Sequence, residues 1–391
     1  MRAAERAWRI GRDFAGVLPR AHTAVAEPGD WNPLSLAGFR QLAEVVLDEL
    51  ALTGMTLTAP PPKLERSLAS CMAAVDQLSR LGIARAHTEP DSLTATSVRR
   101  RKIARLDYEQ LVFEHDPQLP ESLTAEGFGG PATAVVHVCR QGEDRRPWLV
   151  WVHGAGQGQP IDLLISRARR ISDELGFNIA MPVQPGCGVR RGKWPEYPNM
   201  DPLANVAGMT RAVSEVRAVV RWLRPQATAI AVSGVSMGSP VAGLVSHLEP
   251  VDAVAVYTPI FGLNAMIAAH LGRWGPSVRG IIELLSSDIV QQVSSVVDYQ
   301  SVEPSPPPDR RLIVGAWHDQ MARREPALAL YERWGGQLYW HQGSHVGHLF
   351  AGGVQAVSER FLHALALCGT PESGRPAAPP GRRSGWLART D

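Results

Sequence analysis

From about residue 125 the sequence alternates short apolar runs with longer stretches of helical periodicity, and this alternation limits the chain to few folds. The short runs are rich in β-branched residues and lack polar alternation, which is typical of strands covered by helices on both faces. Strand and helix repeated in this way favour an α/β fold with a mostly parallel, doubly wound sheet. The predicted strands are Thr133–Cys139, Trp148–Val152, Asn178–Val183, Ala227–Ser233, Val251–Thr258, Arg311–Ala316 and Gln337–His341.

The segments between these strands have helical periodicity, with two exceptions. The link from Gln141 to Asp144 is too short for a helix, so the first two strands are expected to form an antiparallel hairpin at the leading edge of the sheet. Residues from about 262 to 306 break the alternation and predict a helical insertion that serves as a lid and ends in a proline-rich run. The helices predicted between strands are 160–175, 203–224, 237–248, 321–334 and 351–367.

Two flanking segments differ in character from this α/β unit. Before it, apolar residues recur at helical spacing over 42–50 and again over 68–78. We interpret this N-terminal helical extension as a packing or lid module, because it shows no motif that carries chemistry. The predicted division is an extension with a lead-in segment at 1–124, a catalytic domain at 125–369 and a disordered tail, rich in Pro, Gly and Arg, at 370–391.

Charge and composition exclude several partner classes. The chain has 40 Lys and Arg against 38 Asp and Glu, a net charge of +2, which gives no electrostatic basis for binding nucleic acid or a membrane surface. No segment has the roughly 18 apolar residues of a membrane span, so no integral membrane association is expected. The four cysteines are widely spaced and indicate neither a disulfide framework nor a zinc knuckle, which favours a reducing, cytoplasmic location. Nothing in the sequence specifies an oligomeric state.

One motif indicates the chemistry. The predicted strand Ala227–Ser233 runs into Gly234-Val235-Ser236-Met237-Gly238, and an apolar helix follows at once. G-x-S-x-G between a strand and a helix is the pattern of a nucleophile elbow, in which a sharp turn needs glycines on both sides of the serine. The turn lifts the hydroxyl clear of the sheet and directs the N–H groups of the next helix at the reacting carbon. Ser236 is therefore the predicted nucleophile.

With this motif the sequence resembles the α/β-hydrolase superfamily. Upstream, the strand Trp148–Val152 ends in His153-Gly154-Ala155-Gly156, which is similar to the H-G-x-G oxyanion loop of that family. The resemblance implies that the backbone N–H of Ala155, with Gly154 as the second candidate, joins that of Met237 in the oxyanion hole. His153 is expected to orient the loop.

The same resemblance requires an acid and then a histidine downstream of the serine. Asp319 follows the strand Arg311–Ala316 and is the predicted acid; it can also cap the helix after it. His345 lies in Gly343-Ser344-His345, beyond the last strand, and is the predicted base, with His348 as runner-up. Two aspartates of the insertion are weaker rivals for the acid, Asp288 and Asp298.

These residues together predict a serine hydrolase of esterase or lipase type. A serine hydroxyl is scarcely ionised at neutral pH, so it needs the imidazole as base and the carboxylate to hold the imidazole tautomer. The substrate would be a small-molecule ester or acyl compound, with no cofactor and no metal. Two alternatives remain open: an acyltransferase or thioesterase with the same triad, and a catalytically silent hydrolase-fold protein that serves as a binding scaffold.

Two segments suggest how a substrate is selected. The insertion is rich in large apolar residues, which suit an acyl chain or equally the packing of a lid on the sheet. After Val183 a glycine-rich loop carries Arg190, Arg191 and Lys193. These cations can attract an anionic substrate such as a CoA thioester, but solvated loop charges are the favoured interpretation.

Overall fold

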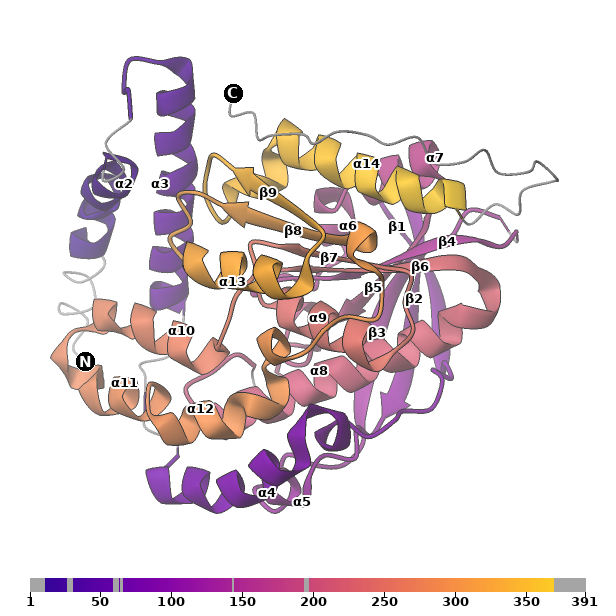
Figure 1. Ribbon diagram of the computed structural model, residues 1–391, viewed down its shortest axis with the longest axis horizontal. Coiled ribbons are helices and arrows are strands. Elements are labelled where there is room, and N and C mark those ends of the chain that lie inside the picture. The colour runs from indigo at the N-terminus through magenta and orange to yellow at the C-terminus, as the bar shows by residue number, and fades with distance from the viewer. Residues whose placement is uncertain are drawn as a thin grey trace.

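A single mixed sheet forms the centre of the molecule in the computed structural model, which describes residues 11–26, 31–58, 63, 66–142, 144–192 and 197–368 (Figure 1). The strands lie in the order β1-β2-β3-β5-β4-β6-β7-β8-β9, and all pairs from β5 to β9 are parallel. Their bounds are β1 Ser97–Ile103, β2 Leu106–His115, β3 Ala132–Cys139, β4 Arg146–Val152, β5 Asn178–Val183, β6 Ala227–Val235, β7 Ala253–Tyr257, β8 Arg311–Ala316 and β9 Gln337–His341. The predicted mostly parallel α/β sheet is confirmed.

Helices cover both faces of the sheet, as the continuous apolar strands predicted (Figure 1). Residues of α8, α9 and α13 share one apolar core with one side of the strands. Residues of α7 and α14 share a second core with the other side. The bounds are α6 Asp162–Ile165, α7 Ala168–Leu175, α8 Pro202–Leu223, α9 Gly238–Leu248, α13 Arg324–Trp334 and α14 Gly352–Cys368. The sheet is therefore doubly wound.

The antiparallel part of the sheet differs from the expectation. β3 pairs with β2 and β5, not with β4, so the predicted hairpin between β3 and β4 is wrong. β5 lies between β3 and β4, so the link over 140–145 has to cross two strand spacings, about 10 Å. A short extended link can span this distance. β3 is also not at the leading edge, since β1 and β2 lie outside it.

β1 and β2 were not predicted, and they lie before residue 125, in the segment assigned as lead-in. β1 reads Ser-Val-Arg-Arg-Arg-Lys-Ile and is exposed over its central residues. Such a charged strand is typical of a sheet edge, where the charges oppose pairing with another chain. β2 alternates buried and exposed positions and connects this edge to the core.

The N-terminal helices pack at two separate places. α2 (Val17–Ala26) and α3 (Leu36–Thr58) stand together beside β9 and the insertion, whereas α4 (Leu68–Ala86) and the short α5 (Glu121–Thr124) lie beneath α8 (Figure 1). α4 shares an apolar cluster with α8 and α12, which includes Leu78, Leu203 and Val293. The extension thus contacts the α/β unit on two sides.

The insertion is helical, as predicted, with α10 (Leu263–Leu271), α11 (Arg279–Leu285) and α12 (Asp288–Ser294) followed by short 3₁₀ turns. None of the described helices is long and apolar enough to cross a membrane. The predicted disordered tail, residues 370–391, lies outside the described residues.

Candidate active site

The turn between β6 and α9 holds Ser236 in a strained backbone conformation. Its φ is 51°, in the left-handed region that residues with a side chain seldom adopt. The Ser236 N–H donates to the carbonyl of Tyr257 on β7 at 2.9 Å, which fixes the turn against the neighbouring strand. A Cβ at Gly234 would overlap the backbone of Gly238, and one at Gly238 would overlap the carbonyl of Val152. Both glycines of the motif are therefore required by close backbone approach.

The structure brings Ser236, His345 and Asp319 together from three loops at the carboxyl ends of parallel strands. The Ser236 Oγ and His345 Nε2 are 2.8 Å apart, and His345 Nδ1 lies 2.7 Å from Asp319 Oδ2. The other oxygen of Asp319, Oδ1, accepts the N–H groups of Met321 and Ala322 at 2.7 Å each. One carboxylate thus orients the imidazole and also closes the turn ahead of α13.

The environment of His345 favours its charged form. Burial alone lowers its pKa, but the charge of Asp319, the hydrogen bond to it and the charge of Asp48 outweigh burial and raise the pKa above the usual 6.5. The imidazole is therefore a stronger base than a free histidine. A base of this strength, hydrogen-bonded to a serine hydroxyl, can take up its proton during nucleophilic attack.

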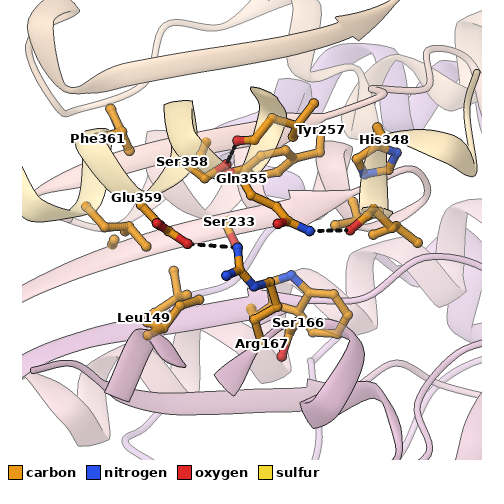
Figure 2. A pocket seen from close by; sticks show the side chains of 18 of the residues that line it. Leu149, Ser166, Arg167, Ser233, Tyr257, His348, Gln355, Ser358, Glu359 and Phe361 are labelled. Atoms are coloured by element: carbon orange, nitrogen blue, oxygen red, sulfur yellow. Dashed lines mark hydrogen bonds and ion pairs between the residues drawn. The ribbon is translucent and has the colours of Figure 1, made fainter. Parts of the chain in front are cut away.

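His348, the second candidate for the base, lies behind the triad. Its ring stacks on Tyr257 with centroids 6.2 Å apart, and its Nδ1 hydrogen-bonds to the carbonyl of His345. Burial lowers its pKa to about 4. His348 lines a mostly apolar cavity between the sheet, α7 and α14, with a volume of about 90 Å³. Figure 2 shows His348 at the margin of this cavity, which the ion pair of Arg167 and Glu359 also borders. The structure thus places His348 apart from Ser236, against the core.

The predicted oxyanion donors differ in their hydrogen bonding. Met237 precedes the first turn of α9, and in the described part of the chain neither its N–H nor that of Ala155 donates a hydrogen bond. The N–H of Gly154 donates to Gln157 Oε1 at 2.7 Å, so this runner-up is already engaged. An added Cβ at Gly154 would lie 3.3 Å from the Cβ of Ser236, so the loop runs directly past the serine. The backbone N–H groups of Ala155 and Met237 are thus both without a hydrogen bond in the described part of the chain.

His153 has the orienting position that the sequence suggested. It is fully buried, its Nε2 accepts the N–H of Gln184 at 3.0 Å, and its Nδ1 lies 2.8 Å from the carbonyl of Gly154. Burial lowers its pKa to about 4, so the ring is neutral at physiological pH. It ties the loop after β4 to Gln184, which follows the end of β5.

The glycine-rich loop after β5 does not present its first arginine to a substrate or to solvent. Arg190 is 3% exposed, and its guanidinium forms two hydrogen bonds to the carboxylate of Glu215, at 2.6 and 2.9 Å. Both interpretations of Arg190 are therefore wrong: its charge is neutralised inside the protein. Arg191 is exposed, and Lys193 lies outside the described residues.

The large apolar residues of the insertion pack mainly inward. Leu263, Leu271 and Leu285 are buried, and Phe261 stacks on Tyr299 at 5.1 Å between ring centroids. Of the two uses that the sequence left open for these residues, packing of the lid against the sheet is the one that this arrangement favours.

Sequence reasoning missed a set of buried carboxylates that α3 brings to the histidine loop. Asp48 accepts the N–H groups of His345 and Val346 at 2.8 Å each, and Glu44 contacts the ring of His341 at 2.6 Å. The signal was present, because acidic residues at 44 and 48 share one face of a helix with apolar neighbours. Nothing in the local sequence indicates what that face contacts.

The electrostatics of these two carboxylates differ. Burial and the charge of Asp319 raise the pKa of Asp48, although His345 and two backbone N–H groups act in the opposite direction. Burial also raises the pKa of Glu44, but hydrogen bonds from His341 and Arg40 outweigh it and hold that pKa at about 2. Within the described ranges, no three His, Cys, Asp or Glu side chains are placed to hold a metal ion.

Comparison with known proteins gives relatives in mycobacteria. The uncharacterized protein Rv2627c of Mycobacterium tuberculosis (strain ATCC 25618 / H37Rv) is 30% identical over 300 residues, covering 73% of this chain and 71% of that protein. The uncharacterized protein MT2702 of Mycobacterium tuberculosis (strain CDC 1551 / Oshkosh) is 28% identical over 384 residues, covering 93% and 89%. No protein-family model matches the chain.

Solved structures of esterases are also similar to the chain. Acetyl xylan esterase 1 from Thermoanaerobacterium sp. JW/SL YS485 covers 79% of this chain and 96% of its own, at 14% identity and a TM-score of 0.49. An acetyl xylan esterase from Paenibacillus sp. R4 covers 78% and 96%, at 15% identity and a TM-score of 0.48.

Proposed function

The chain belongs to the same family as the uncharacterized mycobacterial protein Rv2627c, and we propose that it is a serine hydrolase of the α/β-hydrolase superfamily that cleaves carboxylic esters. The observation that carries the proposal is the unbroken relay from the Ser236 hydroxyl through His345 to Asp319, with 2.8 and 2.7 Å between successive heavy atoms. Such a relay is what a serine needs to act as a nucleophile near neutral pH.

The proposed reaction runs in two halves. In the first, His345 Nε2 takes the proton of Ser236 while Oγ bonds to the ester carbonyl carbon, and the resulting oxyanion accepts the N–H groups of Met237 and Ala155. His345 then gives the proton to the leaving alcohol as the C–O bond breaks. In the second half a water, deprotonated by the same nitrogen, attacks the acyl-enzyme, releases the acid and restores Ser236.

The proposal includes a substrate class. It is a small-molecule or acyl-chain ester, and the proposed reaction needs no metal or organic cofactor. We also propose a cytoplasmic location; Cys71 and Cys139 are buried and form no disulfide among the described residues, which suits a reducing compartment.

The two alternatives are separated by different observations. A silent binding scaffold has no need for a strained serine aligned with a base, and the alignment of Ser236 with His345 speaks against it. An acyltransferase or thioesterase would use the same acyl-enzyme, so its distinction rests on the acceptor that takes the acyl group.

The test is hydrolysis of p-nitrophenyl esters by wild type and two serine variants. Ser236→Ala should lose at least about 10³-fold in kcat, because it removes the nucleophile. Ser239→Ala is the matched control: its hydroxyl donates to the Gly234 carbonyl at 3.1 Å, within the turn, and it should keep most of the activity. Equal rates in Ser236→Ala and wild type would overturn the proposal. Adding an alcohol or thiol acceptor and analysing the products distinguishes hydrolase from transferase.

A further inference from the structure

We propose that Asp48, on helix α3 of the N-terminal extension, is a positioning residue of this active site, which holds the loops carrying His345 and Asp319 in their reactive arrangement. The inference rests on the proposed function for its effect on catalysis. Its structural basis is a set of hydrogen bonds that can be tested without any substrate.

The Asp48 carboxylate receives hydrogen bonds from both catalytic loops. Oδ1 accepts the Ser344 hydroxyl and the Val346 N–H, each at 2.8 Å. Oδ2 accepts the N–H of His345 at 2.8 Å and that of Gln320 at 3.2 Å. Three of these groups belong to His345 and its two neighbours in sequence, and the fourth belongs to Gln320, which directly follows Asp319. A single side chain thus fixes the distance between the two loops.

A carboxyl group uses both of its oxygens in this arrangement. Three of its described partners, the N–H groups of His345, Val346 and Gln320, can only donate, and a carboxylate has about four lone-pair directions to accept them. An asparagine would place its NH₂ group against the Val346 N–H in one orientation and against the N–H groups of His345 and Gln320 in the other. Asp48 is fully buried, so water cannot take over the role of either oxygen. The loop geometry therefore depends on this one carboxylate.

The histidine loop is shaped to receive α3. A Cβ at Gly343 or at Gly347 would overlap the carboxylate of Glu44, so both glycines leave room for the helix. The Ser344 Oγ lies 2.8 Å from the carbonyl oxygen of Glu44 and 2.8 Å from Asp48 Oδ1, so two residues of α3 share its one hydroxyl hydrogen. The close fit extends over the whole segment 343–347. These contacts hold the loop itself, whereas a lid would only cover the surface of the site.

The next residue of α3 ties the same helix to the insertion. Glu49 is 2% exposed and accepts hydrogen bonds from Arg273 at 2.8 and 3.0 Å and from Arg20 of α2 at 2.6 Å. α3 thus lies between the insertion and the catalytic loops, bonded to both. The extension, in which the sequence shows no catalytic motif, is on this account a structural part of the active site.

The first test compares Asp48→Asn with Glu249→Gln in the full-length protein. Glu249 is a matched control, because its carboxylate is also buried and hydrogen-bonded, by Arg217 and Arg221, but lies beyond the far end of α9. With p-nitrophenyl butyrate, Asp48→Asn should lower kcat about 100-fold, since small misplacements of catalytic groups cost this much. Its KM should stay within about threefold, and Glu249→Gln should keep the wild-type kcat. A wild-type kcat in Asp48→Asn would overturn the inference.

The pH profile separates positioning from general destabilisation. His345 is faced by the carboxylates of Asp319 and Asp48, with His348 on its own loop and His270 on α10 nearby. The charge of Asp48 helps to raise the pKa of His345, so Asp48→Asn should move the acidic limb of kcat to lower pH. Glu249→Gln should leave that limb in place.

Amide hydrogen exchange tests the geometry without a substrate. In Asp48→Asn the amides of His345, Val346 and Gln320 should exchange at least about tenfold faster, while those of β8 stay protected. Unchanged exchange at these amides would overturn the inference even if ester hydrolysis is lost. Faster exchange in a protein whose wild type cleaves no ester would leave the anchoring intact and refute only the proposed function.

If Asp48→Asn does not fold, Asp48→Glu takes its place. It keeps the charge and the acceptors but shifts them by one methylene. Its kcat should therefore lie below the wild-type value, by less than the roughly 100-fold loss expected for removal of the acceptor. A wild-type kcat together with wild-type exchange at residues 344–346 in Asp48→Glu would overturn the inference.

Discussion

The substitution Asp319→Asn tests the assignment of the acid with little change of shape. In the structure Asp319 Oδ1 accepts two backbone N–H groups at 2.7 Å, from Met321 and Ala322. The amide oxygen of an asparagine must stay there, so its NH₂ group points at His345 Nδ1. That nitrogen then has to accept, and the proton moves to Nε2, where the imidazole can no longer take the proton of Ser236.

The magnitude follows from this change of tautomer. In serine proteases the same replacement lowers kcat about 10⁴-fold while the geometry is kept. At about 1.36 kcal/mol for each factor of ten, this corresponds to about 5 kcal/mol of lost transition-state stabilisation. We expect a loss of similar size here, because the 2.7 Å contact between Asp319 Oδ2 and His345 Nδ1 has the same role.

The assay is steady-state hydrolysis of a p-nitrophenyl ester at pH 7.5, with urea unfolding to verify that the variant is folded. Asp288→Asn is the control, since Asp288 is exposed on the insertion and was a rival candidate for the acid. It should keep wild-type kcat. A kcat for Asp319→Asn within tenfold of the wild-type value would refute the role of Asp319, and a large loss in Asp288→Asn would point to the rival.

Three further outcomes are expected. Since the base must be neutral to accept a proton and the pKa of His345 is raised, kcat should fall as the pH decreases, with a midpoint above 6.5; a midpoint near 5 would contradict this. His348→Ala should keep kcat within about tenfold, because its ring packs behind the triad; a loss equal to that of His345→Ala would contradict the assignment. Gly238→Ala should lower the free energy of unfolding in urea by about 2–3 kcal/mol, because its Cβ would lie 2.7 Å from the His153 carbonyl oxygen. Gly280→Ala is the control and should keep the wild-type stability, since there is open space at its Cβ. Equal stabilities of the two variants would contradict the close packing of the turn at Ser236.

Much of the fold can be predicted from the sequence because its strands are buried on both faces. Runs such as Asn178–Val183 and Arg311–Ala316 have no polar alternation, and both appear as predicted. β1 escaped prediction because its side chains are Arg and Lys at an exposed edge, where hydrophobic periodicity gives no signal. The pairing of β3 with β5 was not predicted for another reason. Strand order depends on long-range packing, about which local sequence patterns carry no information.

The candidate site likewise contains residues that local sequence identifies and residues that it does not. Ser236 could be identified because the elbow is a local device, whose glycines and flanking strand and helix are all adjacent in sequence. Asp48 could not, because its partners on the histidine loop lie 296 to 298 residues away. Its burial next to a base becomes visible only when α3 is placed in space.

The most direct test of the central claim is labelling with a fluorophosphonate, which reacts covalently with an activated serine. We expect the folded wild-type protein to be labelled on Ser236, as mapped by mass spectrometry, and Ser239→Ala to be labelled equally. Ser236→Ala should show no labelling. Folded wild-type protein that takes up no label, or label that persists in Ser236→Ala, would contradict the proposal that Ser236 is the nucleophile of a serine hydrolase.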